Sequence, residues 1–284
     1  MSMTKVQKYL LCILSILVCI SSTFCLSIYR SIYVTPNQVE TTYISIKDDK
    51  IPENMKNHTI AYFSDFQYGE FQNKNRSKIF FKQLEHLNPD IVLFGGDLFD
   101  QSYMPNEKDV EFLVKSFQKI EAPLGKFAIF GEQDVFSSER KQLVESIYKQ
   151  GEIEVLYNDR RSVSNQSTDS IQIIGMGPNP SWNQALSSIH DDDFNILLCH
   201  KPDSLLSSDL NHMPIDYALV GHSHGDQISF PFIGGYEEWK GAKKINRNHG
   251  KKLEFPYHVT SGIGCIRINA RFQSKPEIVY ILLK

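Results

Sequence analysis

Two histidines stand two residues apart in Gly221-His222-Ser223-His224, directly after the apolar run 217–220. Residues at positions i and i+2 of an extended segment point the same way, and Gly221 allows the backbone to bend, so both imidazoles can face one point. Neutral imidazole is a common ligand of zinc, manganese and iron. Because a polar turn with two incidental histidines has the same local sequence, the pair indicates a metal site only if other ligands accompany it.

Four earlier strand-like runs also end in residues that bind metals. These residues are Asp65, Asp97, Glu132 and His200. The runs are continuously apolar, which is typical of strands buried on both faces, and helix-like segments at 75–87, 107–120 and 137–149 alternate with them. This order predicts an α/β fold. Because ligand sites in such sheets form at the carboxyl ends of strands, we expect these side chains to face one rim.

The ordered set of motifs resembles that of the calcineurin-like metallophosphoesterases. The family's D-x-H, G-D-x-x-D, G-N-H-D/E, lone H and G-H-x-H motifs stand here as Asp65-Phe66-Gln67, Gly96-Asp97-Leu98-Phe99-Asp100, Gly131-Glu132-Gln133-Asp134, His200 and Gly221-His222-Ser223-His224. Segments 225–231 and 260–264 also resemble the membrane-anchored bacterial branch related to UDP-diacylglucosamine hydrolases. Five motifs in the correct order are far more specific than any one of them.

The resemblance implies two stacked mixed β-sheets flanked by helices, in a four-layer sandwich. It also implies two divalent metal ions, which could be manganese, zinc, iron or magnesium. The first ion would be held by Asp65, Gln67, Asp97 and His224. The second would be held by Asp97, Glu132, His200 and His222, so that Asp97 bridges the two. A hydroxide between the metals would then attack phosphorus in line, while both ions stabilise the developing charge.

Three positions depart from the family's pattern. Gln67 replaces a histidine, so the first metal keeps at best an amide oxygen there, and Glu132 replaces an asparagine and adds a negative charge. Gln133 replaces the histidine that protonates the leaving group, although the acidic partner of that histidine is retained as Asp100. An amide cannot transfer a proton, a step that contributes ~10²–10⁴-fold to the rate.

Two functions are compatible with these substitutions. One is a metal-dependent hydrolase of a phosphodiester, pyrophosphate or phosphomonoester, with a phosphorylated small molecule or lipid as its substrate. The other is a non-catalytic domain that binds a metal or a phosphorylated ligand. The chain has 284 residues and a net charge of −3, so we expect no nucleic-acid partner.

The N-terminal region contains an uncharged apolar run at 9–29, bounded by Lys8 and Arg30. Its length matches the ~20 residues that a helix needs to cross a bilayer. We therefore expect a transmembrane anchor that makes the lipid membrane a partner of the protein. A cleaved signal peptide is the alternative, but Ser21-Ser22-Thr23 fits a cleavage site poorly.

Charged residues around this run predict an orientation. Lys5 and Lys8 precede it, which favours a cytoplasmic tail at 1–8 and a single-pass protein whose catalytic domain is extracytoplasmic. A tether with a first strand would occupy 30–57, and the phosphoesterase domain 58–284. The basic segment 240–252 is either a solvated loop or a lid that meets anionic phosphate or the bilayer surface.

Overall fold

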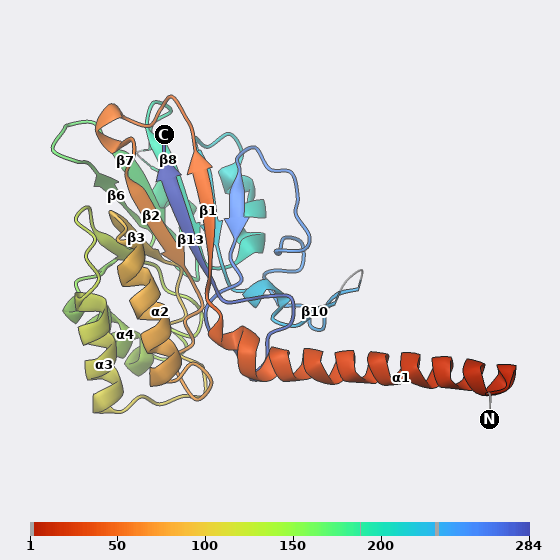
Figure 1. The fold of residues 1–284 in the computed structure, drawn as a ribbon. Helices are drawn as coiled ribbons and strands as arrows, with labels where there is room; N and C mark the ends of the chain where they lie inside the picture. Colours follow the sequence, from red (N-terminus) through yellow and green to blue (C-terminus); the bar gives the residue numbers. More distant parts are fainter. Residues whose placement is uncertain (1–2, 188, 231–232) are drawn as a thin grey trace.

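Two β-sheets pack face to face in the computed structural model, which describes residues 3–187, 189–230 and 233–284 (Figure 1). The six-stranded sheet has the order β1-β13-β2-β3-β4-β5, with β1 at Glu40–Ile46, β2 at Thr59–Phe63, β3 at Ile91–Phe94, β4 at Lys126–Ala128, β5 at Glu154–Val155 and β13 at Glu277–Leu283. The five-stranded sheet has the order β12-β9-β8-β7-β6, with β6 at Asp159–Val163, β7 at Ile171–Gly175, β8 at Phe194–Cys199, β9 at Tyr217–Val220 and β12 at Tyr257–Val259.

Both sheets are mixed. Strand β13 runs antiparallel to β2, and β6 runs antiparallel to β7, whereas the neighbouring pairs are parallel. Apolar side chains from the facing strands fill the space between the sheets, among them Ile60, Leu93, Ile196 and Leu219, all fully buried. Each such side chain contributes ~1.5–3 kcal/mol relative to an exposed one. The predicted fold of two stacked mixed sheets is therefore confirmed.

Three helices cover the outer face of the six-stranded sheet (Figure 1). They are α2 (Lys74–Leu87), α3 (Glu107–Gln118) and α4 (Ser138–Gln150), close to the bounds expected from the sequence. The side chains of Asn73, Asn106 and Ser137 accept backbone N–H groups at the three N-termini, which satisfies donors that have no partner within a helix. The outer face of the five-stranded sheet packs against the short helix α5 (Trp182–Leu186) and the 3₁₀ helices η4 (Pro202–Leu206) and η5 (Ser208–Leu210).

The segment 30–57 contains the first strand, β1. Strand β1 pairs in parallel with β13 from Glu40↔Glu277 to Ile46↔Leu283. The segment predicted to hold a tether and a first strand therefore contributes an edge strand to the first sheet. This pairing joins residues from opposite ends of the chain, and short-range sequence patterns do not report such a contact.

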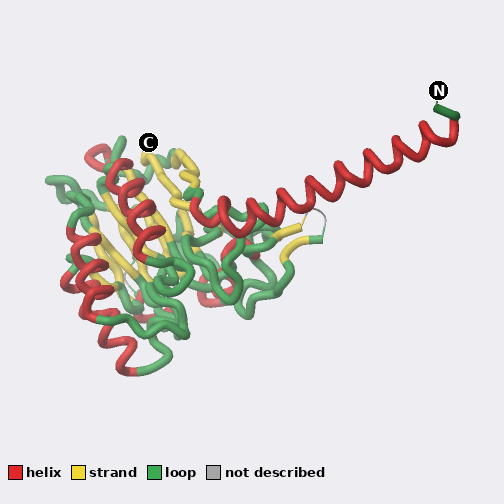
Figure 2. The backbone as a smooth tube through the Cα atoms, turned by 60° about the horizontal axis from the view of Figure 1, so that its bottom comes forward, coloured by secondary structure: helices red, strands yellow, loops and turns green. Residues whose placement is uncertain are grey.

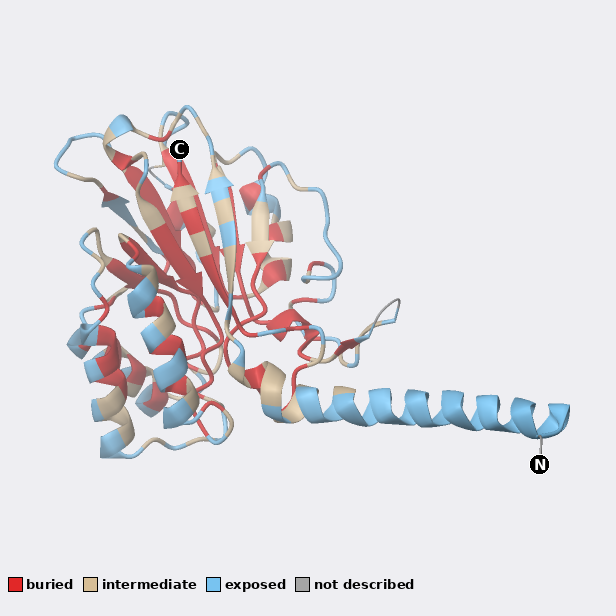
Figure 3. Cartoon of the chain, viewed as in Figure 1, coloured by how far each residue is buried: buried red, intermediate tan, exposed pale blue. Residues whose placement is uncertain are grey.

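Helix α1 (Lys5–Tyr29) projects from the domain without covering any part of it, and none of its residues is buried (Figure 3). It continues through a π-helical turn, η1 (Arg30–Val34), and a 3₁₀ turn, η2 (Thr35–Asn37). The whole segment Lys5–Asn37 has 33 residues, and its most apolar window has a mean hydropathy of 2.4. By length and composition it can cross a bilayer, and it contains the predicted span 9–29.

Candidate metal centre

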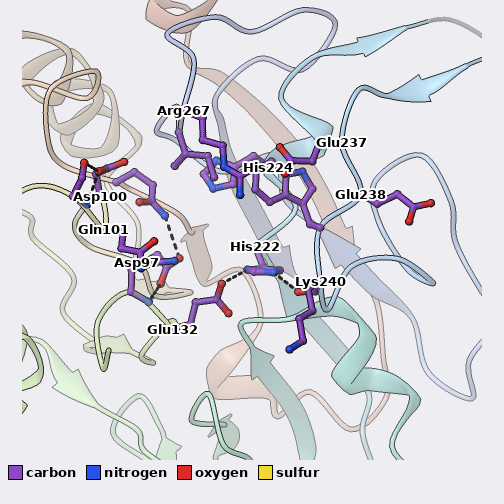
Figure 4. Close-up of a pocket in the computed structure, with 15 residues that line it drawn as sticks. Asp97, Asp100, Gln101, Glu132, His222, His224, Glu237, Glu238, Lys240 and Arg267 are labelled. Carbon is purple, nitrogen blue, oxygen red and sulfur yellow. Dashed lines mark hydrogen bonds and ion pairs between the residues drawn. The ribbon is translucent and has the colours of Figure 1, made fainter. Parts of the chain in front are cut away.

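The ends of five strands meet at one edge of the two sheets. Asp65, Asp97 and Glu132 follow the parallel strands β2, β3 and β4. His200 follows β8, and the pair His222/His224 follows β9, its parallel neighbour. The structure thus brings together the side chains that the sequence placed on one rim, as Figure 4 shows for several of them.

Each of the three histidines uses one ring nitrogen to bond a backbone carbonyl. His200 Nδ1 lies 2.8 Å from the carbonyl oxygen of Gly95, and His222 Nε2 lies 2.8 Å from that of Lys240. His224 Nδ1 lies 3.3 Å from the carbonyl oxygen of Gly264. A carbonyl can only accept, so these nitrogens carry protons, and in the neutral ring the other nitrogen has the lone pair that can ligate a metal. Histidines that ligate metals are oriented in this way.

The second ring nitrogens of His200 and His224 face carboxylates. His200 Nε2 lies 3.2 Å from Asp97 Oδ2 and 3.8 Å from Asp65 Oδ1, and His224 Nε2 lies 3.6 Å from the same Asp65 oxygen. Possible ligand atoms of Asp97, His200 and His222 all lie within 4.8 Å of one another. His200 Nε2, Asp65 Oδ1 and Gln67 Oε1 are buried without a hydrogen-bond partner. Because each such atom costs about 1–3 kcal/mol if left unsatisfied, the donor set fits a bound cation.

The electrostatics of the cluster also favour a cation. Burial lowers the pKa of His200, but the carboxylates of Asp97 and Asp65 outweigh it and raise that pKa to about 10. Burial alone would raise the pKa of Asp97, yet His200 and the Gln133 N–H hold it below its usual value. Burial lowers the pKa of His224 to about 4, which keeps this ring neutral and able to ligate. The field that attracts a proton to His200 would equally attract a metal ion.

The substituted residues Gln67 and Glu132 lie at the cluster. Gln67 Nε2 donates to Asp97 Oδ2 over 3.1 Å, which leaves its amide oxygen for another partner. Glu132 Oε1 lies 3.7 Å from His222 Nδ1, while its other oxygen forms an ion pair with Lys201. The sequence interpretation gave Lys201 no role, although it directly follows His200. The structure shows that Lys201 neutralises part of the charge that Glu132 adds.

Gln133 and Asp100 both line the pocket above the cluster. The backbone N–H of Gln133 donates to Asp97 Oδ1 over 2.9 Å, which fixes the loop beside that carboxylate. Asp100 accepts from the backbone N–H of Ser102 over 2.9 Å and from the Ser102 hydroxyl. The family's pattern has an acid–histidine pair here. This pocket instead holds the Gln133 amide and the Asp100 carboxylate, which is hydrogen-bonded within its own turn.

The backbone at the cluster is held in an unusual conformation. Left-handed φ angles of 49–66° occur at Asp65, Gln67, Asp97, His222 and His224. Non-glycine residues rarely adopt this region, and such strain is concentrated at functional sites. A Cβ atom at Gly131 would stand 2.0 Å from Asp97 Oδ1, so only glycine lets the two loops approach this closely.

Two buried residues that the sequence interpretation gave no role hold the loops in place. Asp134 accepts backbone N–H groups from Asp97, Leu98 and Gly131 over 2.7–2.9 Å, and burial together with the nearby Asp97 raises its pKa to about 7. The sequence could have indicated a role for Asp134, because this residue ends the third motif. Arg271 is fully buried and donates to several carbonyls, including those of Ser261, Gly262, Gly264 and Ser274. No local pattern marks this arginine.

Part of the cluster lines a pocket of about 730 Å³. Its walls come from distant parts of the chain and are formed by Gln67, Asp97, Asp100, Gln101, Ser102, Glu132, Gln133, His222, His224, Glu237, Glu238, Trp239, Lys240, Ile266 and Arg267 (Figure 4). Arg267 pairs with Glu237 and stacks over the Trp239 ring, whose centroid lies 5.3 Å from the guanidinium carbon. In the basic segment 240–252, Lys243 pairs with Glu238 and Arg247 with Glu277.

The family model of the calcineurin-like phosphoesterases matches residues 58–226, which contain all five motifs. This match covers more than half of the chain, so the chain belongs to that family. The protein is a metallophosphoesterase, a hydrolase of phosphoester bonds in a family that uses divalent metal ions.

Characterised and uncharacterised bacterial proteins are similar over most of the chain. The metallophosphoesterase YkuE of Bacillus subtilis is 29% identical, covering 89% of this chain and 88% of the relative. Phosphodiesterase YaeI of Escherichia coli is 26% identical over 69% of this chain and 70% of its own length. The UDP-2,3-diacylglucosamine pyrophosphatase LpxG of Chlamydia trachomatis is 22% identical over 70% of this chain and 73% of its own.

Proposed function

We propose that the protein is a membrane-anchored phosphoesterase that uses two divalent metal ions to hydrolyse a phosphodiester, pyrophosphate or phosphomonoester on a lipid or envelope molecule. The observation that carries this proposal is the convergence of three histidines on carboxylates beside the pocket: His200 Nε2 and His224 Nε2 lie against Asp65 and Asp97, and His222 Nδ1 lies against Glu132. The anchor is α1, whose apolar side chains are exposed along its length.

Two sets of residues would hold the ions, and Asp97 belongs to both. One set is Asp65, Gln67, Asp97 and His224, and the other is Asp97, Glu132, His200 and His222. When bound, divalent ions in such a centre supply a nucleophile from water at neutral pH and stabilise charge on the phosphoryl oxygens. The second set has two imidazoles, so we expect it to bind its ion more tightly than the first.

The other pocket residues act on the substrate. Lys240 places a positive charge on the wall that can attract a phosphorylated substrate, whereas the charge of Arg267 is paired with that of Glu237. Gln133 can donate a hydrogen bond to a phosphoryl oxygen, but it has no proton to transfer to the leaving group. The leaving group must therefore depart as an anion or take its proton from water, which favours substrates whose leaving groups are acidic, such as the phosphates released from a pyrophosphate.

The choice of a lipid or envelope substrate rests on two observations. Helix α1 would confine the pocket to the neighbourhood of a membrane. In addition, the relative from Chlamydia trachomatis is named a pyrophosphatase of a diacylated sugar nucleotide, which is an amphiphilic substrate.

The test uses the full-length protein purified in detergent. We expect hydrolysis of a soluble aryl phosphodiester and of a lipid-linked pyrophosphate to require manganese or another divalent ion, and to stop when a chelator is added. Metal content measured by plasma mass spectrometry should fall in parallel. A protein that binds no divalent ion and hydrolyses neither substrate would contradict the proposal.

We further propose that residues 1–8 are cytoplasmic and the catalytic domain extracytoplasmic, because Lys5 and Lys8 precede the uncharged run 9–29. Protease added to spheroplasts is expected to digest the domain while a cytoplasmic marker protein stays intact. Survival of the domain until the membrane is broken would reverse the assignment.

A further inference from the structure

Four large apolar or aromatic side chains are exposed near the mouth of the pocket. Phe230 and Ile233 belong to the hairpin of β10 (Ser229–Phe230) and β11 (Gly234–Gly235), Tyr236 follows it, and Ile268 lies on a neighbouring loop. Their exposed fractions are 43%, 82%, 40% and 45%. We call this group the apolar surface. Exposed patches of this kind mark sites of contact with proteins or membranes.

Two backbone hydrogen bonds and a ring contact connect the apolar surface to the base of α1. The backbone N–H of Arg271 donates to the carbonyl of Ser31 over 2.8 Å. The next residue, Phe272, accepts the N–H of Ser229 over 3.0 Å, and its ring lies 5.7 Å from that of Phe230. Figures 1 and 2 both place the hairpin beside α1, on the side toward which the helix projects. The apolar surface and the helix therefore face the same region of space.

A second contact fixes the loop that carries Ile268. Arg76 donates to the side chain of Asn269 over 2.6 Å and to that of Asn37 over 2.8 Å. Asn37 ends the helical segment, so this arginine ties the loop to the point where the segment enters the domain. The orientation of the apolar surface relative to α1 is thus set by hydrogen bonds on two sides.

Aromatic residues mark the level at which α1 would leave the bilayer. Tyr29 and Tyr33 are exposed at the C-terminal end of the apolar run, with ring centroids 5.2 Å apart, and Arg30 lies between them. Tyrosines gather at the boundary between membrane and water, and arginines at that level reach into the headgroups. The boundary between membrane and water therefore falls at the C-terminal end of α1, which is the end joined to the domain.

We propose that the apolar surface enters the headgroup region of the same bilayer that α1 spans, and that it holds the mouth of the pocket against the membrane. The occupant of this surface is the lipid bilayer. Arg267 and Glu237, which are the sequence neighbours of Ile268 and Tyr236, line the pocket, so a phosphoester on a membrane lipid reaches the pocket without leaving the bilayer surface. The inference rests on the proposed anchoring and adds a second, independent point of membrane contact.

The experiment places a tryptophan at one position at a time in the full-length protein, reconstituted in lipid nanodiscs. The discs contain phosphatidylcholine with or without brominated acyl chains, because bromine quenches tryptophan at short range. Emission is compared with that of the unsubstituted protein, which contains two native tryptophans. The test variants are Ile233→Trp and Ile268→Trp. Leu17→Trp reports on α1. Gln150→Trp is the control, since Gln150 is exposed at the C-terminal end of α4, a helix that lies away from α1 (Figure 1).

We expect brominated lipid to remove most of the added emission of Ile233→Trp, Ile268→Trp and Leu17→Trp, and to leave that of Gln150→Trp unchanged. Quenching of Leu17→Trp alone would overturn the inference while preserving the anchor. A second copy of the chain that covered the apolar surface and shielded it from lipid would give this same result. Absence of quenching at Leu17→Trp as well would overturn both the inference and the membrane anchoring on which it rests.

Discussion

Replacing His222 with alanine is expected to lower kcat/KM on a soluble aryl phosphodiester by on the order of 10³-fold, because metal ions supply several kcal/mol of transition-state stabilisation and each 1.36 kcal/mol is tenfold in rate. His222 holds its Nε2 against the Lys240 carbonyl, and its Nδ1 lies beside Glu132. Without this ring, the set of Asp97, Glu132 and His200 keeps one imidazole. We therefore expect bound metal, measured by plasma mass spectrometry after dialysis, to fall together with activity.

The matched control is His86→Ala. His86 is exposed in the last turn of α2, so this variant removes the same side chain at a distance from the pocket. It should retain both metal and activity. If His222→Ala also retained its metal and its rate, the two-metal proposal would be wrong, and the hydrolytic centre would have to be sought elsewhere in the protein.

The substitution Gln133→His is expected to raise activity on alkyl phosphodiesters about tenfold or more and to change activity on aryl phosphodiesters little. A general acid contributes ~10²–10⁴-fold where the leaving group needs a proton, whereas an aryl oxide departs without one. The backbone N–H of Gln133 donates a hydrogen bond to Asp97, and Gln133 and Asp100 line the same pocket. An imidazole at this position would therefore stand where the leaving group departs.

The pH dependence separates proton transfer from a change in binding. An imidazole acts as a general acid only while protonated, and its ordinary pKa is about 6.5. The gain on alkyl substrates should therefore be largest below that pH and should disappear as the pH rises through it. Gln133→Asn, which has no titrating proton, should show no gain at any pH. An equal gain on aryl and alkyl substrates would refute the role assigned to position 133.

Local sequence patterns predicted a large part of the fold. Continuous apolar runs identified β2, β3, β8 and β9, because strands buried on both faces admit few polar residues. Strand β13 and its pairing with β1 were not predicted, since this contact joins opposite ends of the chain. The outer layer of short helices was equally hard to foresee, because α5 has only five residues and little periodicity.

The sequence alone determined which residue types stand at the ends of the strands. Asp65, Asp97, His200 and the pair His222/His224 each follow an apolar run that must be buried, so their placement on one rim follows from burial and from parallel strand order. The basic segment was less informative, because its charges are divided between the pocket and internal ion pairs with Glu238 and Glu277.

Only the tertiary structure decided how these residues can act. The nitrogen that each histidine presents depends on a carbonyl from another loop, at Gly95, Lys240 or Gly264. The ion pair of Lys201 with Glu132 and the position of the hairpin beside α1 likewise depend on segments that meet only after folding. Short motifs determine the identity of ligands, but the proton positions, the charge balance and the direction of the pocket arise from contacts between residues that are distant in the sequence.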